Sequence, residues 1–250
     1  MYQEERLKKI MEWLEKEQIL SNQELMRRLE VSRDTARRDI VRLTENGSAV
    51  RTHGGIARVD FQTQVGNYQT RMTDNPDGKQ RIAKVVAEIL TEGSLCFFDT
   101  STHMKFVCKE LKKEISVYTH SLDNLGDLAQ IPKVDVHCLG GRLNKNNRFF
   151  YGYEVWEALS QKRFDYVILG AAAVLKDGIY FEDEEDARIK QLAAKRGKQV
   201  IVLADYPKFQ RESKYRAVEW NMIDLLITDR ALSKEWEDRF LKEKLRWQVV

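Results

Sequence analysis

Hydroxyl, carboxylate and imidazole side chains stand together directly after one short apolar run. The run covers residues 95–98, and the residues that follow it are Asp99, Thr100, Ser101, Thr102 and His103. A helix-length segment with Phe106 and Leu111 comes next. Small polar residues between a strand end and a helix start can bind an anion, because free N–H groups and the helix dipole point at the ligand. This segment is therefore a candidate ligand-binding loop.

Polar or glycine residues also follow the later apolar runs. In open α/β sheets, ligands lie outside the carboxyl ends of the strands, so these segments should gather at one edge. They are Thr119-His120-Ser121, Gly140-Gly141-Arg142, Gly170-Ala171 and Ala204-Asp205. Each one alone is typical of an ordinary turn or helix cap, and only their recurrence favours a ligand site.

A second set of candidate residues lies on a predicted helix over about residues 33–45. Ala36, Ile40 and Leu43 form its apolar face, and Arg38 and Arg42 lie opposite. A helix-turn-helix presents the start of its second helix to base edges and uses nearby arginines for phosphates. We therefore expect DNA contact from this helix, through Ser32, Arg33, Thr35, Arg37, Arg38 and Arg42.

The alternative is a solvated helix whose arginines pair with neighbouring acids. Those acids would be Asp34, Asp39 and Glu45. Residues 48–58 favour DNA binding, because they are typical of two short strands around a Gly54-Gly55 turn and would make a winged helix-turn-helix. Arg51, His53 and Arg58 are then candidates for phosphate or minor-groove contact, although His53 could equally be a plain turn residue.

Local signals divide the chain into three parts. An apolar stripe from Leu7 to Leu14, a capping box at Ser21 and Glu24, and an N-cap at Ser32 predict three helices before the hairpin. We expect a winged helix-turn-helix domain over residues 1–58 and a linker over 59–78. Over 79–250, short apolar runs alternate with amphipathic stretches, which predicts a larger Rossmann-like α/β domain with a mostly parallel sheet.

Composition excludes several classes of protein. The 250 residues carry 42 Lys and Arg against 39 Asp and Glu, so a nonspecific polycation is excluded. We see no apolar run long enough for a membrane helix and no secretory signal, and three scattered cysteines suit a reducing cytoplasm. No cofactor is expected. The acidic run over 182–186 is better explained as a helix start than as a metal site, and His103 with His120 lacks a third zinc ligand.

Residues 31–40, followed by Gly47 and by Arg51-Thr52-His53-Gly54-Gly55, resemble the signature of DeoR-type bacterial transcriptional regulators. That resemblance implies DNA contact by Ser32, Thr35, Arg37, Arg38 and Arg42, with residues 48–58 as the wing. The segment over 79–250 resembles the DeoR-type sensor domain. The fold of that domain is related to ribose-5-phosphate isomerase, and the domain usually binds phosphorylated sugars. The effector contacts implied by this resemblance are Asp99, Thr100, Ser101, Thr102, Lys190 and Lys208.

The chain departs from the family pattern around the ligand loop. Ser101 replaces a glycine, His103 a threonine, His120 an asparagine and Asp186 a glutamate. We therefore hypothesise that the effector differs from the commonest family ligands or binds weakly.

We expect a repressor of carbohydrate-metabolism genes that binds a double-stranded DNA operator and a small-molecule effector. Symmetric operators suit a homodimer or homotetramer. The alternative is a sugar-phosphate isomerase-like enzyme with an appended DNA-binding head. That alternative rests on fold analogy. Asp99 or Asp205 could serve as its base, but no isomerase-type acid/base set is recognisable.

Overall fold

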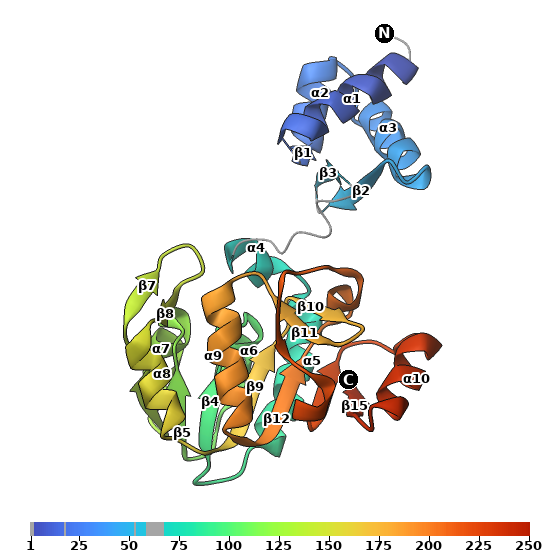
Figure 1. Cartoon of the computed structure of the whole chain (residues 1–250). Coiled ribbons are helices and arrows are strands. Elements are labelled where there is room, and N and C mark those ends of the chain that lie inside the picture. The colour runs from blue at the N-terminus through green and yellow to red at the C-terminus, as the bar shows by residue number, and fades with distance from the viewer. Residues whose placement is uncertain (1–2, 18, 53, 59–67) are drawn as a thin grey trace. The chain divides into compact units, whose positions relative to one another are not determined.

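The chain forms two compact units, residues 1–64 and 65–250, which we call the head and the body (Figure 1). The computed structural model describes residues 3–17, 19–52, 54–58 and 68–250. Among these residues, no helix is long and apolar enough to cross a membrane.

The head is a winged helix-turn-helix, as the sequence predicts. Its helices are α1 (Gln3–Glu17), α2 (Asn22–Leu29) and α3 (Arg33–Glu45), and its strands are β1 (Ile19–Ser21), β2 (Ala49–Thr52) and β3 (Gly55–Arg58). The predicted capping box is present: Ser21 Oγ accepts from the Glu24 amide, and the Glu24 carboxylate accepts from the Ser21 amide. Ser32 Oγ caps α3 by accepting from the Thr35 amide. Ile10, Leu14, Leu25, Ile40 and Leu43 are among the core residues.

The wing hairpin turns one residue earlier than the Gly54-Gly55 prediction. Thr52 pairs with Gly55 at the end of the hairpin, and Gly54 has φ +99°. Gly55 belongs to β3, which lies between β1 and β2. A Cβ at Gly55 would lie 2.0 Å from the Leu20 carbonyl oxygen, so the close approach of two strands requires this glycine. His53 lies outside the described residues.

A seven-stranded parallel sheet forms the centre of the body, in the order β15-β14-β12-β9-β4-β5-β6. The strands are β4 (Leu95–Phe98), β5 (Ile115–Thr119), β6 (Val134–Cys138), β9 (Phe164–Gly170), β12 (Gly197–Leu203), β14 (Leu225–Thr228) and β15 (Arg246–Val249). From β4 the sheet continues through β5 to β6, and from β9 it continues in the opposite direction through β12 and β14 to β15. The switch point of the sheet, where α/β folds bind ligands, therefore lies between these two strands.

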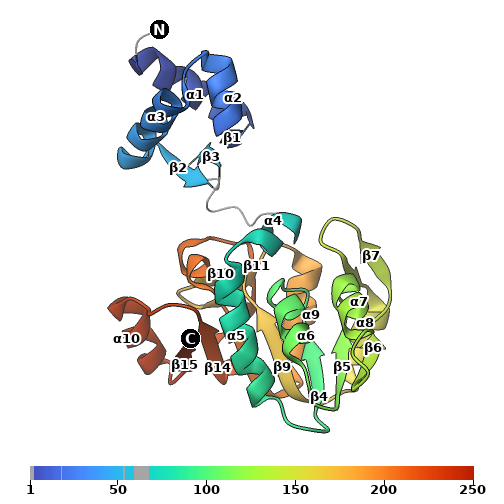
Figure 2. The ribbon, with the colours of Figure 1, turned by 180° about the vertical axis from the view of Figure 1, so that it is seen from behind.

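Helices cover both faces of this sheet (Figures 1 and 2). On one face lie α5 (Pro76–Ile89), α6 (His103–Glu110) and α7 (Leu122–Leu128), and on the other lie α8 (Tyr153–Ser160) and α9 (Glu184–Lys195). Neighbouring strand residues enter opposite cores: Phe97 and Val167 pack toward α8 and α9, whereas Phe98 and Ile168 pack toward α5 and α6. Burial on both faces explains why the strands are continuous apolar runs.

Several elements were not predicted from the sequence. They are β1 in the head, the hairpin of β7 (Arg142–Asn144) and β8 (Phe149–Tyr151), the small sheet of β10 (Ala173–Leu175), β11 (Gly178–Phe181) and β13 (Tyr215–Val218), the 3-10 helices η2 (Tyr206–Gln210) and η3 (Trp220–Met222), the helix α10 (Lys234–Lys242), and β15.

Helix α4 (Tyr68–Thr73) and the start of α5 lie within the predicted linker over 59–78. Pro76 begins α5, and the preceding Asn75 donates from Nδ2 to Asp229 Oδ2 at 2.9 Å, which ties this segment to the body. Residues 59–67 lie outside the described part of the chain.

Candidate functional site

The outer face of α3 carries four exposed arginines, Arg33, Arg37, Arg38 and Arg42. Within the described residues, none of them has an ion-pair partner. Asp39, which the solvated-helix alternative assigned to them, is 0% exposed and faces α1 instead. It accepts from Arg6 Nε at 2.7 Å and from Arg6 Nη2 at 3.0 Å. The positive charge of α3 is thus available to an outside partner.

Other predicted DNA contacts lie beside this face. Arg51 is exposed on β2, and Ser32 is exposed at the start of α3. Thr35 is half-buried, and its hydroxyl lies 3.0 Å from that of Ser32. The helix start and one strand of the wing therefore offer polar groups next to the arginines.

A cavity of about 250 Å³ opens at the carboxyl edge of the sheet, at the switch point between β4 and β9. Its described lining residues are Arg71, Thr100, Ser101, Asn147, Phe149, Gly170, Ala171, Ala172, Phe181, Glu182, Asp183, Asp186 and Lys190. Three of the predicted effector contacts, Thr100, Ser101 and Lys190, are among them.

A buried ion-pair network forms one wall of this cavity. Lys190 Nζ lies 3.0 Å from Asp99 Oδ2 and 2.7 Å from Asp186 Oδ2. Burial by itself would raise the pKa of the Asp186 carboxyl, but Lys190 and His120 outweigh burial and hold that pKa below its usual range. Asp186 is therefore ionised, and Lys190 is paired with two carboxylates, those of Asp99 and Asp186.

Asp99 holds the ligand loop to the sheet. Its Oδ1 accepts from the Ser101 amide at 2.8 Å, and its Oδ2 accepts from the Gly170 amide at 2.9 Å. These bonds join the ends of β4 and β9, the two strands of the switch point. Asp99 itself lies behind the cavity lining.

His120 and its neighbours lie behind the same wall. His120 is buried, with its Nε2 3.0 Å from Asp186 Oδ1 and its ring stacked on Phe97. Thr119 Oγ1 accepts from the Ser121 amide, and Ser121 Oγ caps α7. The contacts that the structure shows for Thr119, His120 and Ser121 are with other groups of the protein. Direct contact of these residues with the effector stays a prediction.

His103 connects the ligand loop to a second buried cluster. Its Nδ1 lies 3.1 Å from Ser101 Oγ, and its Nε2 lies 3.6 Å from Asp205 Oδ1. Burial lowers the pKa of His103 to about 3, so the imidazole is neutral near pH 7. Among the described residues, no group of three His, Cys, Asp or Glu side chains is placed to hold a metal ion.

Lys208 lies in this second cluster rather than in the cavity lining. Burial, assisted by Arg211 and Lys79, lowers the pKa of Lys208 to about 7 against the opposing effect of Asp205. Thr102 is also buried, and its hydroxyl donates to the Arg71 carbonyl at 3.4 Å.

The predicted Gly140-Gly141-Arg142 segment shapes the turn between β6 and β7. Gly141 has φ +146°, and a Cβ there would lie 2.6 Å from the Tyr151 carbonyl oxygen. Arg142 is exposed, with its guanidinium 5.7 Å from the Tyr151 ring centroid. None of the three is among the described lining residues of the cavity.

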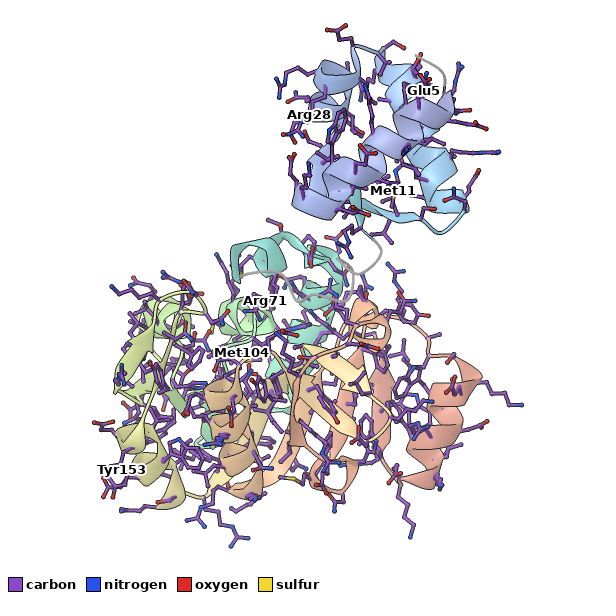
Figure 3. The ribbon with its side chains drawn as sticks, turned by 45° about the horizontal axis from the view of Figure 1, so that its top comes forward. Glu5, Met11, Arg28, Arg71, Met104 and Tyr153 are labelled. Atoms are coloured by element: carbon purple, nitrogen blue, oxygen red, sulfur yellow. The ribbon has the colours of Figure 1, made fainter. Side chains whose placement is uncertain are left out.

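Several lining residues of the cavity were not predicted from the sequence. One of them is Arg71 on α4, which carries a charged side chain (Figure 3). Asn147 and Phe149 come from the unpredicted β7–β8 hairpin. The acidic run over 182–186 begins a helix, as predicted, and Asp183 caps α9 by accepting from the Glu185 and Asp186 amides. Glu182, Asp183 and Asp186 of this run also line the cavity, a role that the helix-start pattern did not indicate.

Comparisons with known proteins agree with both units. Residues 6–62 match the DeoR-like helix-turn-helix domain, and residues 74–230 match the DeoR C-terminal sensor domain. The HTH-type transcriptional repressor GlcR of Bacillus subtilis is 36% identical over 92% of this chain and 90% of its own. The HTH-type transcriptional regulator GlpR of Haloferax volcanii is 30% identical over 92% of this chain and 91% of its own.

A solved structure of ribose 5-phosphate isomerase A from Neisseria gonorrhoeae covers 54% of this chain and 53% of its own, with a TM-score of 0.40 and 17% identity. That likeness is too slight to bear on function. The sensor model alone spans more than half of the chain, and GlcR is similar over nearly all of it. The chain therefore belongs to the DeoR family of transcriptional regulators, with an N-terminal DNA-binding domain and a C-terminal sensor domain.

Proposed function

We propose that this regulator is a repressor of carbohydrate-metabolism genes whose operator affinity is controlled by a phosphorylated sugar. The observation that carries DNA binding is the row of arginines on the outer face of α3, which have no ion-pair partner in the part of the chain that the structure describes. The names of similar proteins support repression rather than activation, because GlcR is named a repressor. They also support the class of regulated genes: a glycerol-3-phosphate regulon repressor of Escherichia coli is 28% identical over 92% of each chain.

In the proposed complex, the start of α3 enters the major groove. Ser32, Thr35 and Arg33 lie nearest the base edges, and Arg37, Arg38 and Arg42 bind phosphates, with Arg51 of the wing and His53 as further contacts. Each phosphate contact contributes about 0.9 to the slope of log affinity against log salt concentration. Sequence choice comes from the few side chains at base edges rather than from the net charge of +3.

A gel-shift titration across salt concentrations, with the region upstream of the protein's own gene, tests this proposal. We expect Arg38→Ala to weaken binding and to lower the salt slope by about one. Arg27→Ala is the matched control, because Arg27 is exposed on α2 and has no described partner. Equal affinity and slope for Arg38→Ala and the wild type would contradict the assignment.

The body cavity is the proposed effector site. Its volume of about 250 Å³ suits a small metabolite, and Thr100, Ser101 and Lys190 line it. Ser101 fills space that a glycine would leave open, because a Cβ on Gly170 would lie 2.1 Å from Ser101 Oγ. This crowding supports an effector that differs from the commonest family ligands.

Thermal-shift and calorimetric titration tests the effector class. The panel contains glucose 6-phosphate, fructose 1-phosphate, ribose 5-phosphate and glycerol 3-phosphate, each with its unphosphorylated parent. We expect a phosphorylated compound to bind and to release operator DNA, and its parent to bind much more weakly. Binding of parents alone would reject the phosphorylated class.

The regulator is proposed to act in the cytoplasm as a homodimer or homotetramer and to have no isomerase activity. Asp99, one candidate base for an enzyme, is held by Lys190 and two amides, and Asp205 lies outside the described cavity lining. Light scattering measures the oligomeric state. Turnover of ribose 5-phosphate by the full chain would reject the non-enzymatic proposal.

A further inference from the structure

Strand β6 lies at one edge of the seven-stranded sheet (Figure 2). Its inner side pairs with β5, and no strand in the described part of the chain pairs with its outer side. The Ile115 amide donates to the Lys133 carbonyl, and the Leu139 amide donates to the Thr119 carbonyl. Because backbone groups alternate in direction along a strand, the N–H and C=O groups of Val136 point away from β5. The outer side of β6 can therefore accept another strand.

Two polar side chains project from one face of β6. Charged side chains on an edge strand ordinarily prevent pairing with a second strand. Here the two groups are complementary, because His137 Nε2 lies 2.8 Å from Asp135 Oδ2. The His137 ring is also stacked on the Tyr118 ring of β5, with centroids 4.2 Å apart. These contacts hold a carboxylate and an imidazole two positions apart on the edge strand.

The spacing of these two groups makes β6 complementary to a second copy of itself. In a symmetric antiparallel pair of strands, one residue lies on the two-fold axis and faces its own copy. With Val136 on the axis, Asp135 lies opposite His137 of the second copy on both sides, and all five residues of β6 are paired. These are non-hydrogen-bonded positions, where opposite Cα atoms are about 4.5 Å apart and side chains meet.

The other registers that pair at least three residues of β6 are unfavourable. With Asp135 on the axis, two carboxylates face each other, and with His137 on the axis, two imidazoles do. Like groups directly opposite each other destabilise a strand pair. Charge thus selects the register that also pairs the most residues.

The opposite edge of the sheet provides a contrast. Strand β15 lies there, and Arg246 is the one charged residue of its sequence Arg-Trp-Gln-Val. No register of β15 against a second copy therefore places opposite charges across an axis. Of the two edges of the described sheet, β6 is the one that is complementary to itself in charge.

The other face of β6 adds apolar contact. Val134 and the half-buried Val136 belong to the core beneath α5 and α6, and Cys138 on the same face is exposed. Across the axis, Val136 would meet its own copy, and Val134 would meet Cys138. Leu143 on β7 and Tyr153 on α8 are exposed large apolar side chains from the elements that follow β6, and Tyr153 is 74% exposed (Figure 3).

We propose that the body dimerises through β6, so that the sheets of two copies join into one continuous sheet about a two-fold axis at Val136. The two copies of Val136 exchange backbone hydrogen bonds, and Asp135 pairs with His137 of the second copy on both sides of the axis. This inference rests on the proposed homo-oligomer and names the surface that forms it. Such a dimer carries two heads, as the two half-sites of a palindromic operator require.

The test measures the dissociation constant of the full chain by analytical ultracentrifugation at pH 7. Asp135→Lys sets a lysine against His137, and His137→Asp sets two carboxylates against each other, so each variant should raise the dissociation constant at least about tenfold. An equimolar mixture of the two variants should dimerise again, because the introduced lysine then faces the introduced aspartate. Gln248→Lys is the matched control, because Gln248 is exposed on the other edge strand, and it should match the wild type.

Val136→Pro tests the backbone pairing. The Val136 N–H points away from β5, so proline removes no hydrogen bond of the body's own sheet and takes away the donor at the axis. We expect this variant to lose the dimer and to keep the circular dichroism spectrum of the wild type. If the proline variant does not fold, the two charge variants and their mixture decide.

The outcomes separate this inference from the proposed function. An oligomeric wild type whose dissociation constant is unchanged in Asp135→Lys and His137→Asp would overturn the inference and leave the proposed oligomer. Failure of the mixed variants to form a heterodimer would also overturn it. A wild type that stays monomeric would reject both the inference and the proposed oligomer, while the sugar-phosphate panel tests the effector class independently.

Discussion

Lys190→Met tests whether the ion-pair network at the cavity stabilises the body. Lys190 is buried between Asp99 and Asp186, at 3.0 and 2.7 Å. Methionine conserves most of the side-chain volume and removes the charge, so two carboxylates lose their shared cation. We expect the substitution to destabilise the body at pH 7.

The size of the effect follows from two opposing contributions. At an effective dielectric constant of 20, charges about 3 Å apart attract by about 5 kcal/mol, and desolvation offsets much of this. Removing one partner of a buried pair costs about 3–5 kcal/mol. Asp99 keeps two amide donors, and Asp186 keeps His120 and Thr100. The expected loss is therefore near the lower end, about 3 kcal/mol.

The pH dependence has a definite sign. In the wild type, the pKa of Asp186 is held below its usual range, so its contribution to stability is present above about pH 4 and is lost only in stronger acid. Without Lys190, burial raises the pKa of the Asp186 carboxyl, and the variant gains stability as acid protonates that carboxyl. The difference between wild type and variant should therefore shrink from pH 7 to pH 5.

Urea unfolding followed by tryptophan fluorescence measures both effects. Four of the five tryptophans lie in the body, at positions 156, 220, 236 and 247. Lys195→Met is the matched control, because Lys195 is exposed on the same helix. If the two variants have equal unfolding free energies at pH 7, the network does not stabilise the body and the reasoning fails.

Three further predictions concern other parts of the molecule. Gly55→Ala should unfold or weaken the head, because its Cβ would meet the Leu20 carbonyl, whereas Gly126→Ala has open space and should be neutral; circular dichroism melts of both variants check this. Asp39→Asn should cost the head about 1–3 kcal/mol through the lost charge of the Arg6 pair, measured by urea unfolding at the Trp13 signal. The pKa of Lys208 falls from 10.5 to about 7, so its buried charge penalises the folded state below pH 7 and the penalty is relieved as pH rises toward 10. Stability should thus rise from pH 7 to pH 9 in the wild type, and a rise of the same size in Lys208→Met would contradict this assignment.

Local sequence signals were sufficient for most of the secondary structure. The capping box at Ser21, the N-cap at Ser32 and the apolar stripes involve residues three or four positions apart, so the sequence alone places the head helices. The central strands are buried on both faces, so each is a continuous apolar run that can be recognised in the sequence alone. The β7–β8 hairpin and the small β10–β11–β13 sheet lack such runs, and α4 is too short to show a period.

From the sequence alone came the family, the head helices, six of the central strands and the loop where a ligand is expected. Tertiary structure decided which side chains meet. Asp39 looked like a partner for its own helix, yet packing of α1 against α3 gives it to Arg6. Closing the sheet between β4 and β9 places Lys190 against Asp99, 91 positions away in the chain. Arg71 carried no local signal, because its place in the cavity depends on how α4 docks across the ends of the strands. Contacts between residues so far apart depend on chain topology, which short-range patterns do not encode.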